Sequence, residues 1–397
     1  MTASRVEVGG FVAPGFERVA AKFERNFTAR QEVGAAFAAT LGGRPVVDLW
    51  GGLADPERGE PWREDTVQVI FSGTKGLVAA CLVLLMDRGL LSLDDTVADH
   101  WPEFAARGKA SVRVRDVVSH AARLPGMCTR VTWQEATDDR RMAALLASQP
   151  QCEDDRAART YHAITFGWLC GELVRRVDGR SIGAFFAQEI AAPLGLDLWI
   201  GVPEGVEHRI ARISVGATWS RAAIARARPD SHDRLLASVF GNPVRFDPAD
   251  GFPWNEPTWL AAEIPGVNAV GTTRSIARLY GQLPELLSRE ALEVACRPLT
   301  SRVDPLLGKP MTFGVGFQLQ TEDRPFGPPP DGFGHGGTGG SRHGRWPAVD
   351  LGFSYAMNEL RPEHGDVRAT ELLRALHESV TALREPREGS APMLDRR

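Results

Sequence analysis

The placement of the strand-like runs, near the two ends of the chain, is the feature that most constrains the fold. Residues 35–41 and 45–50 are two short apolar runs joined by a Gly-Gly pair, a pattern that predicts an antiparallel hairpin. In residues 313–319 and 351–357 the side-chain pattern repeats every two residues, which predicts two further strands. The sequence between these ends is mostly helical in pattern. We therefore expect a sheet built from both termini, a helical region inserted in the middle, and a cleft between the two.

Seven runs predict helices, because their apolar residues recur at three- and four-residue spacing or fill the whole run. These runs are residues 14–27, 72–88, 113–120, 165–176, 182–190, 271–283 and 366–383. The last dozen residues are charged and contain two prolines, so we expect a loose tail there.

The length of 397 residues suits two packed lobes with a large core. We assign residues 1–75 and 265–397 to an α/β domain and residues 76–264 to a mostly helical inserted domain. Residues 213–260 carry five prolines and three tryptophans. This composition is typical of an ordered loop that lines the cleft, and equally of a variable surface insertion.

Charge and composition disfavour several classes of partner. The 46 Lys and Arg residues against 50 Asp and Glu give a net charge of −4 without a long single-sign run, so we expect neither nucleic acid nor a membrane surface as a partner. The most apolar run, residues 76–86, is about half of the ~20 residues that span a bilayer, and the chain begins without a signal-peptide pattern. Five scattered cysteines without a CxxC pair indicate reduced thiols. We expect a cytoplasmic monomer or homo-oligomer that needs no metal or other cofactor.

The tetrad Ser72-Gly-Thr-Lys75 lies at the start of the apolar helix predicted at residues 72–88. Positions i and i+3 share one face of a helix, so the hydroxyl and the amine are neighbours. Burial of a lysine on an apolar helix lowers the pKa of its amine, which can then accept the serine proton. The helix N-terminus adds a partial positive charge where an oxyanion forms. A helix-capping serine followed by an exposed lysine is the alternative interpretation.

Three other motif-like patterns are better explained by local structure. Ser181, in a GxSxG match, is expected to cap a helix. The GxGxxG letters at residues 334–339 are not followed by a helical pattern, which disfavours a dinucleotide site. Ser119 and His120 are adjacent in a predicted helix and have poor geometry for a catalytic triad.

Four segments, taken in order, carry a resemblance to a known family: residues 71–76, 87–95, 112–120 and 124–126. Together they resemble the serine β-lactamase and penicillin-binding protein superfamily, most closely its class C-like branch with the family VIII carboxylesterases. The resemblance covers about residues 15–380. It implies an α/β (α+β) fold of the β-lactamase/DD-peptidase type, in which an antiparallel sheet is flanked by helices and carries an inserted, mostly helical domain.

The resemblance implies that Ser72 is the nucleophile and Lys75 its base. The family's catalytic tyrosine corresponds to Tyr161, in the run Tyr-His-Ala that precedes a predicted helix. A core tyrosine with a satisfied hydroxyl is the alternative. Ala163 replaces the asparagine that holds the substrate amide in β-lactamases. This replacement weakens the case for lactam or peptide substrates.

The family's third motif, Lys-Thr-Gly in β-lactamases, corresponds to His335-Gly336-Gly337. We expect these residues on an edge strand, where glycines let a substrate approach the backbone. The resemblance places an oxyanion hole at the backbone N–H groups of Ser72 and Thr338. His335 either orients the leaving group, tunes the catalytic tyrosine, or is structural. A neutral imidazole in place of the lysine argues against anionic β-lactams.

These residues imply a serine carboxylesterase that cleaves a small or medium acyl ester through an acyl-enzyme on Ser72. An acyltransferase of the same fold, which passes the acyl group to an amine or alcohol, is the alternative. β-Lactamase or D-Ala-D-Ala peptidase activity is disfavoured by Ala163 and His335. A catalytically silent binding module is disfavoured by the presence of Ser72, Lys75 and Tyr161 together.

Overall fold

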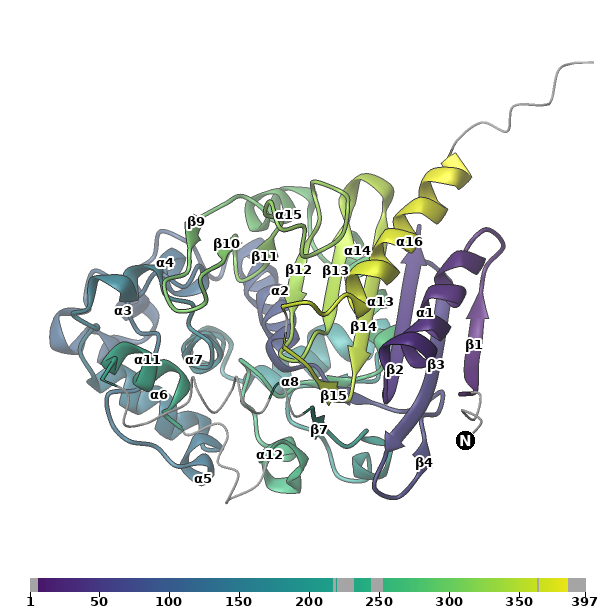
Figure 1. Ribbon diagram of the computed structural model, residues 1–397. Helices are drawn as coiled ribbons and strands as arrows, with labels where there is room; N and C mark the ends of the chain where they lie inside the picture. The colour runs from purple at the N-terminus through teal and green to yellow at the C-terminus, as the bar shows by residue number, and fades with distance from the viewer. Residues whose placement is uncertain (1–5, 217–218, 220–231, 244–252, 363, 385–397) are drawn as a thin grey trace, which may run out of the picture.

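The computed structural model describes residues 6–216, 219, 232–243, 253–362 and 364–384, and its main feature is one large antiparallel sheet (Figure 1). The pairing of strands β2 and β14 joins the two ends of the chain, as the strand-like runs predict. Across the sheet the order is β1 (Val8–Val12), β3 (Arg44–Asp55), β2 (Gly34–Leu41), β14 (Leu351–Met357), β13 (Arg342–Trp346), β12 (Phe333–Gly336), β11 (Gln318–Leu319), β10 (Pro310–Phe313) and β9 (Thr300–Val303), with β4 (Glu60–Pro61) paired to β3.

The predicted hairpin is present, and its turn explains the Gly-Gly pair. Leu41 pairs with Arg44, so Gly42 and Gly43 form a two-residue loop. Their φ angles are 56° and 71°. Positive φ at both central residues is what a type I′ hairpin turn requires, and glycine adopts it without a steric penalty.

Fifteen α-helices lie in the described part of the chain, and most flank the sheet or fill its insertion. They are α1 (Glu17–Arg30), α2 (Thr74–Asp87), α3 (Val97–His100), α4 (Val114–Val118), α5 (Trp133–Ala136), α6 (Asp139–Ser148), α7 (Thr165–Asp178), α8 (Ile182–Phe186), α9 (Ala192–Leu194), α11 (Arg234–Phe240), α12 (Pro257–Ala261), α13 (Thr273–Gly281), α14 (Leu283–Leu286), α15 (Arg289–Ala295) and α16 (Arg368–Arg384). As predicted, Ser181 caps α8 by accepting the N–H of Ala184.

The two faces of the sheet are covered by different helices. Helices α1 and α16 pack together on one face (Figure 1), and Tyr355 of β14 reaches Glu32, just after α1, from that face. Gly352 of the same strand faces α13, because a side chain there would collide with the Ala277 carbonyl. Side chains alternate along a strand, so β14 is buried on both faces.

In the sequence, most helices of the middle region lie between β5 (Gln68–Val69) and β8 (Val270–Gly271). These two strands pair with each other, and β8 also pairs with β6 (Leu198–Trp199). A further short pair joins β7 (Ser214–Val215) to β15 (Glu359–Leu360). The division of the chain at residues 75 and 265 stays a prediction. The charged tail expected after residue 385 lies outside the described residues.

Two of the predicted elements are wrong in extent. The strand expected at residues 313–319 is interrupted, because Gly314 donates to the Phe317 carbonyl in a turn between β10 and β11. Gly316 has a φ of 71°, which breaks the extended pattern. The helix expected at residues 113–120 ends at Val118, and His120 adopts a φ of 63°.

Residues 213–260 are neither wholly irregular nor simply a surface insertion where the structure describes them. They contain helices α11 and α12, and Trp219, Trp254 and Trp259 are buried in the core. Trp254 packs edge-on against Phe71 with ring centroids 5.1 Å apart. Residues 217–218, 220–231 and 244–252 lie outside the described residues. Trp254 therefore supports the core beside Phe71, and Trp219 packs against Trp254 in turn.

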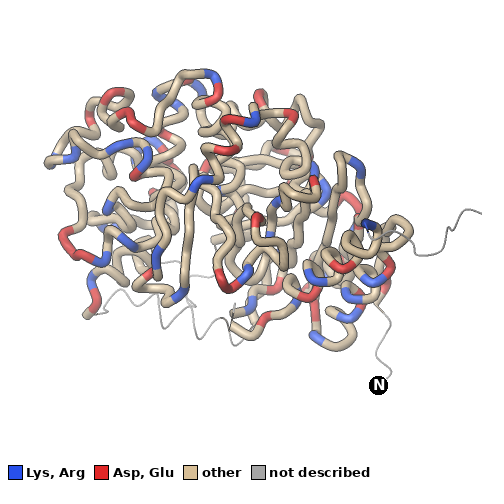
Figure 2. Tube along the Cα trace, turned by 90° about the horizontal axis from the view of Figure 1, so that it is seen from above, with Lys and Arg blue, Asp and Glu red and all other residues tan. Residues whose placement is uncertain are grey.

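Figure 2 shows Lys and Arg interspersed with Asp and Glu along the trace, in keeping with the small net charge. Among the described residues, a helix that combines the length and the apolar character needed to cross a bilayer is absent.

Gly76 lets α2 pack closely against the neighbouring α13, and its substitution tests that packing. A Cβ at this position would collide with the hydroxyl of Tyr280, which is buried without a hydrogen-bond partner among the described residues. We expect Gly76→Ala to lower the free energy of unfolding by about 1–3 kcal/mol in urea denaturation, because overpacking forces the helix to move. Addition of Tyr280→Phe removes the colliding oxygen and should restore part of this loss. A double variant no more stable than Gly76→Ala would contradict the proposed collision.

Candidate active site

Ser72 lies in a 3₁₀ turn, Phe71–Gly73, that leads directly into α2. Phe71 has a φ of 48°, a left-handed conformation that costs free energy for a residue with a side chain. The turn is fixed from the α2 side, because Thr74 Oγ1 donates to the Phe71 carbonyl at 2.6 Å and accepts the Ala269 N–H at 2.9 Å. Ser72 is partly exposed within an otherwise buried run. The strained turn therefore presents one hydroxyl from a rigid, buried support.

Lys75 is fully buried, and its amine lies beside the serine. Nζ donates hydrogen bonds of 2.7 Å to the carbonyls of Ala163 and Gly266. The same nitrogen is 3.2 Å from Ser72 Oγ. The predicted i, i+3 neighbourhood of hydroxyl and amine is therefore present, and the alternative of an exposed lysine is wrong.

Tyr161 lies against the same amine. Lys75 Nζ is 5.0 Å from the centre of the Tyr161 ring. The ring stacks on Phe313 at 5.8 Å with an interplanar angle of 7°, and it contacts the imidazole of His120 at 4.7 Å. The backbone N–H of Tyr161 donates to Asp304 Oδ2 at 2.6 Å. The phenol is thus held by rings on two sides and by its own backbone.

His335 meets the hydroxyl of Tyr161, and its hydrogen bonds define its tautomer. His335 Nδ1 is 2.7 Å from the carbonyl oxygen of Gly336, which can only accept, so Nδ1 carries the proton. Burial holds the pKa of His335 well below its usual range, so the ring is neutral at pH 7. Nε2 is then an acceptor. It lies 3.4 Å from the Tyr161 hydroxyl, which therefore donates to it.

The residues after His335 form a tight turn next to the serine. Gly340 N–H donates to the Gly337 carbonyl at 3.3 Å, which places Thr338 and Gly339 at the centre of a four-residue turn. A side chain on Gly337 would collide with the carbonyl of Ile70, two residues before Ser72. The turn that carries the Thr338 N–H is therefore packed against the segment that leads to the serine.

One expectation about this motif is wrong. Strand β12, which carries His335 and Gly336, is not at the edge of the sheet, because it lies between β13 and β11. Within β12, the short β11 reaches only Phe333 and Gly334. His335 and Gly336 consequently have a strand partner on the β13 side alone, so the end of β12 borders the site although the strand is internal.

Sequence reasoning missed several groups that build this site. His120 and His162 are fully buried beside Tyr161, and the His162 N–H donates to His120 Nδ1 at 3.2 Å. Burial lowers the pKa of His162 to about 3 and that of His120 well below its usual range. The left-handed conformation of His120 removes it from the helix in which it was expected. The carbonyls of Ala163 and Gly266, which hold Lys75, leave no signal in a sequence because every residue has one.

Comparison with known proteins agrees with this architecture. The Beta-lactamase family model matches residues 20–378. The esterase/beta-lactamase LipL of Mycobacterium tuberculosis is 34% identical over 370 residues, which cover 89% of this chain and 83% of LipL. The crystal structure of a family VIII carboxylesterase superimposes with a TM-score of 0.84 at 35% identity, covering 94% of this chain and 100% of that chain. A penicillin-binding protein homologue from Caulobacter crescentus gives a TM-score of 0.82 at 33% identity, with the same coverage.

These matches define the class of protein: a serine hydrolase with the β-lactamase and penicillin-binding protein fold. The chain belongs to the Beta-lactamase family. The fold class and the resemblance inferred from residues 71–126 are therefore confirmed.

Proposed function

We propose that this protein is a carboxylesterase that cleaves a small or medium acyl ester through an acyl-enzyme on Ser72. The observation that carries the proposal is the pairing of Ser72 Oγ with a fully buried amine, Lys75 Nζ, at 3.2 Å. The similarity to the esterase/beta-lactamase LipL and to a family VIII carboxylesterase supports ester cleavage.

The two carbonyls on Lys75 suit a neutral amine as the base. A neutral amine has two N–H groups and one lone pair. The N–H groups donate to Ala163 and Gly266, which leaves the lone pair for the Ser72 hydroxyl. Ser72 then transfers its proton to Lys75 as Oγ attacks the ester carbon. The negative charge on the former carbonyl oxygen would be stabilised by the N–H groups of Ser72 and Thr338.

Tyr161 supplies the proton for the leaving alcohol. In the resting site its hydroxyl donates to the neutral His335, so the phenol is protonated. On collapse of the tetrahedral intermediate, the C–O bond to the alcohol breaks and the departing oxygen takes the phenol proton. The resulting tyrosinate accepts a proton from water, whose oxygen attacks the acyl carbon, and Lys75 returns its proton to Ser72 Oγ. Each group ends in its starting state, as a catalytic cycle requires.

Two features favour an ester over a β-lactam. Ala163 offers no side-chain amide to hold a lactam amide. His335 is kept neutral by burial and cannot supply a fixed positive charge for a β-lactam carboxylate. A small neutral ester needs neither contact.

We propose a small-molecule substrate encountered in a reducing, cytoplasmic compartment. The five cysteines, which are all free thiols, support this location.

Intact-protein mass spectrometry during turnover of p-nitrophenyl butyrate tests the proposed function. We expect an increase in mass by one butyryl group on wild type and none on Ser72→Ala, with p-nitrophenol released only by wild type. Release that is unaffected by an added amine identifies hydrolysis. Release that requires the amine identifies the alternative, an acyltransferase. Equal turnover by wild type and Ser72→Ala would contradict the proposal.

His335 should affect catalysis through its acceptor nitrogen. His335→Leu removes the acceptor for the Tyr161 hydroxyl, and we expect kcat to fall by about ten-fold, the equivalent of one hydrogen bond. His335→Gln retains an acceptor oxygen and should lose less. Steady-state kinetics of both variants with p-nitrophenyl butyrate provides the comparison. Equal kcat values for the two variants would contradict this role.

A further inference from the structure

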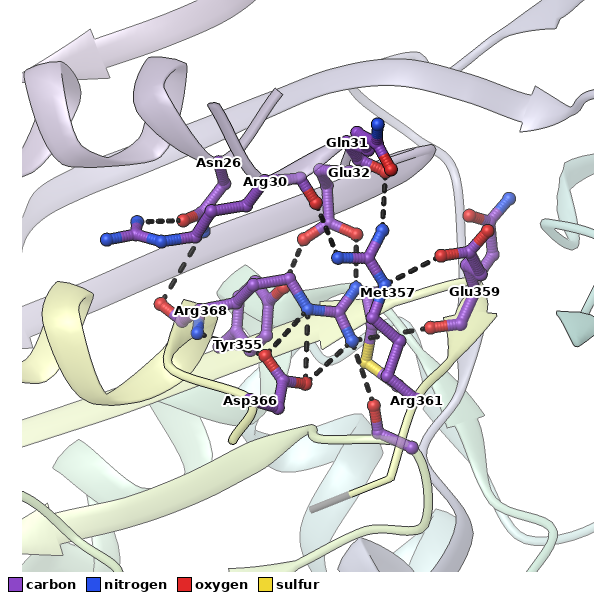
Figure 3. Close-up of polar contacts among 12 residues, drawn as sticks. Asn26, Arg30, Gln31, Glu32, Tyr355, Met357, Glu359, Arg361, Asp366 and Arg368 are labelled. Carbon is purple, nitrogen blue, oxygen red and sulfur yellow. Dashed lines mark hydrogen bonds and ion pairs between the residues drawn. The ribbon is translucent and has the colours of Figure 1, made fainter. Parts of the chain in front are cut away.

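Arg368, the first residue of α16, lies at the centre of a buried charge cluster with Glu32 and Asp366 (Figure 3). The exposed fraction of the side chain is 1% for Arg368 and 0% for Glu32. Arg368 Nη1 donates a 2.6 Å hydrogen bond to Glu32 Oε1, and Nε and Nη2 donate to the Asp366 carboxylate. The second oxygen of Glu32 accepts the hydroxyl of Tyr355. Both oxygens of Glu32 and the carboxylate of Asp366 thus accept hydrogen bonds from within this cluster.

Stability alone is a weak explanation for such a cluster. Burial raises the pKa of Glu32 above its usual range, and the opposing charge of Arg368 does not fully compensate for it. Buried ion pairs are often replaceable by apolar residues without loss of stability, because desolvation cancels the attraction. A guanidinium, however, offers five N–H groups in a fixed plane and can hold neutral acceptors as well as carboxylates.

Arg368 also donates to two neutral acceptors, the Glu359 carbonyl at 3.4 Å and, more closely, the carbonyl of Gly339. Nη2 donates to this oxygen at 3.0 Å, in a buried position. Gly339 directly follows Thr338 in the four-residue turn and has a φ of 88°. The turn has no room on this side, because a side chain on Gly340 would press on the Asp366 carboxylate at 2.6 Å. The charge cluster therefore packs directly against one side of the turn and supports it.

The opposite side of the same turn faces the nucleophile. Gly337 packs against the carbonyl of Ile70, and the Gly337 N–H donates to Ser341 at 3.0 Å. The turn is consequently held between two fixed supports, the Arg368 guanidinium and the segment that leads to Ser72. A shift at Gly339 would move the N–H of the preceding Thr338.

We infer that Arg368 is a positioning residue for the oxyanion hole, acting through the Gly339 carbonyl to fix the N–H of Thr338. This inference rests on the proposed function of Ser72 and Thr338. An oxyanion-hole donor stabilises the transition state only when it is fixed in place before the charge forms. Arg368 touches neither the substrate nor Ser72, so its contribution is to kcat rather than to substrate binding.

Arg368→Lys tests the inference, because lysine keeps the charge for Glu32 but has no second nitrogen to hold Gly339. With p-nitrophenyl butyrate we expect kcat to fall by about 10- to 100-fold with little change in KM. The affinity for phenylboronic acid, whose adduct with a serine carries a tetrahedral centre with an oxyanion-like oxygen, should weaken by a similar factor. Assays are run well below the melting temperature of each variant.

Arg345→Lys is the matched control. Arg345 is also a buried arginine, 5% exposed, and it donates to the carbonyls of Tyr280 and Gly281 and to Asp350, away from the Thr338 turn. We expect this variant to lose stability without losing kcat. An Arg345→Lys variant that loses as much kcat as Arg368→Lys would overturn the inference.

A second variant keeps the test decisive if Arg368→Lys does not fold. Glu32→Gln/Asp366→Asn/Arg368→Met removes the three charges together and leaves no unpaired buried ion. It also lacks the donor to Gly339 and should show the same losses of kcat and boronate affinity. A kcat and a boronate affinity equal to those of wild type, in this variant or in folded Arg368→Lys, would overturn the role of Arg368 but leave the proposed function standing. Wild type that neither turns over the ester nor binds the boronate would overturn the proposed function and the inference with it.

Discussion

Lys75→Met should reduce kcat for p-nitrophenyl butyrate by about 10³-fold or more, close to the loss in Ser72→Ala, because members of one catalytic unit are not additive. Methionine fills the space of the buried stem but cannot accept the Ser72 proton. It also leaves the carbonyls of Ala163 and Gly266 without their donor, which costs about 1–3 kcal/mol for each unsatisfied group. We therefore expect a folded but less stable variant, measured by steady-state kinetics and by urea denaturation.

Lys109 provides the matched control for this experiment. It too is a fully buried lysine, and its amine donates to the carbonyls of Ala106, Ala147 and Gln149 in the helical insertion. Lys109→Met should lower the free energy of unfolding by a similar amount and leave kcat unchanged. If Lys75→Met retained more than a tenth of wild-type kcat, or if Lys109→Met lost as much, Lys75 would not be the base.

The parts of this molecule that could be predicted from the sequence are those encoded over short distances. The hairpin follows from Gly42-Gly43, whose positive φ angles form its turn. The contact of Ser72 with Lys75 follows from helical spacing within four residues. The apolar run of α2 signals its burial directly. In each case local preference and the final fold agree, which is the condition under which sequence patterns are informative.

The parts that could not be predicted depend on backbone groups or on contacts between distant segments. The Lys75 amine is held by carbonyls 88 and 191 residues away, and carbonyls carry no residue signature. His120 leaves its predicted helix through a left-handed conformation that only the packing around Tyr161 explains. The link from Arg368 to Gly339 joins a helix start to a glycine turn. These long-range contacts complete the site, whereas short-range patterns identify its first two residues.

Acid should destabilise this protein strongly, because four histidines are buried in their neutral form. Burial lowers the pKa of His162 and of His343 to about 3, and it holds those of His120 and His335 well below their usual range. In the unfolded chain each imidazole has a pKa of about 6.5. As the pH falls below about 6.5, the unfolded state binds protons that the native state does not, so the free energy of unfolding decreases. The window extends down to about pH 3 for His162 and His343.

The effect is large enough to measure within a narrow pH range. Between pH 7.5 and pH 5.5 each buried histidine should remove about 1.4 kcal/mol, so the four together remove about 5.6 kcal/mol, a large share of the stability of an ordinary domain. Urea denaturation at the two pH values gives the difference. His343 contacts Ser354 and has no role in the proposed mechanism. His343→Gln removes one of the four imidazoles, so the difference in the free energy of unfolding between the two pH values should fall by about a quarter. Equal free energies of unfolding at both pH values would mean that these imidazoles take up protons in the native state as readily as in the unfolded chain. His335 would then be charged at pH 5.5 and could not accept the Tyr161 hydroxyl at that pH, which would contradict the buried neutral imidazole inferred for the site.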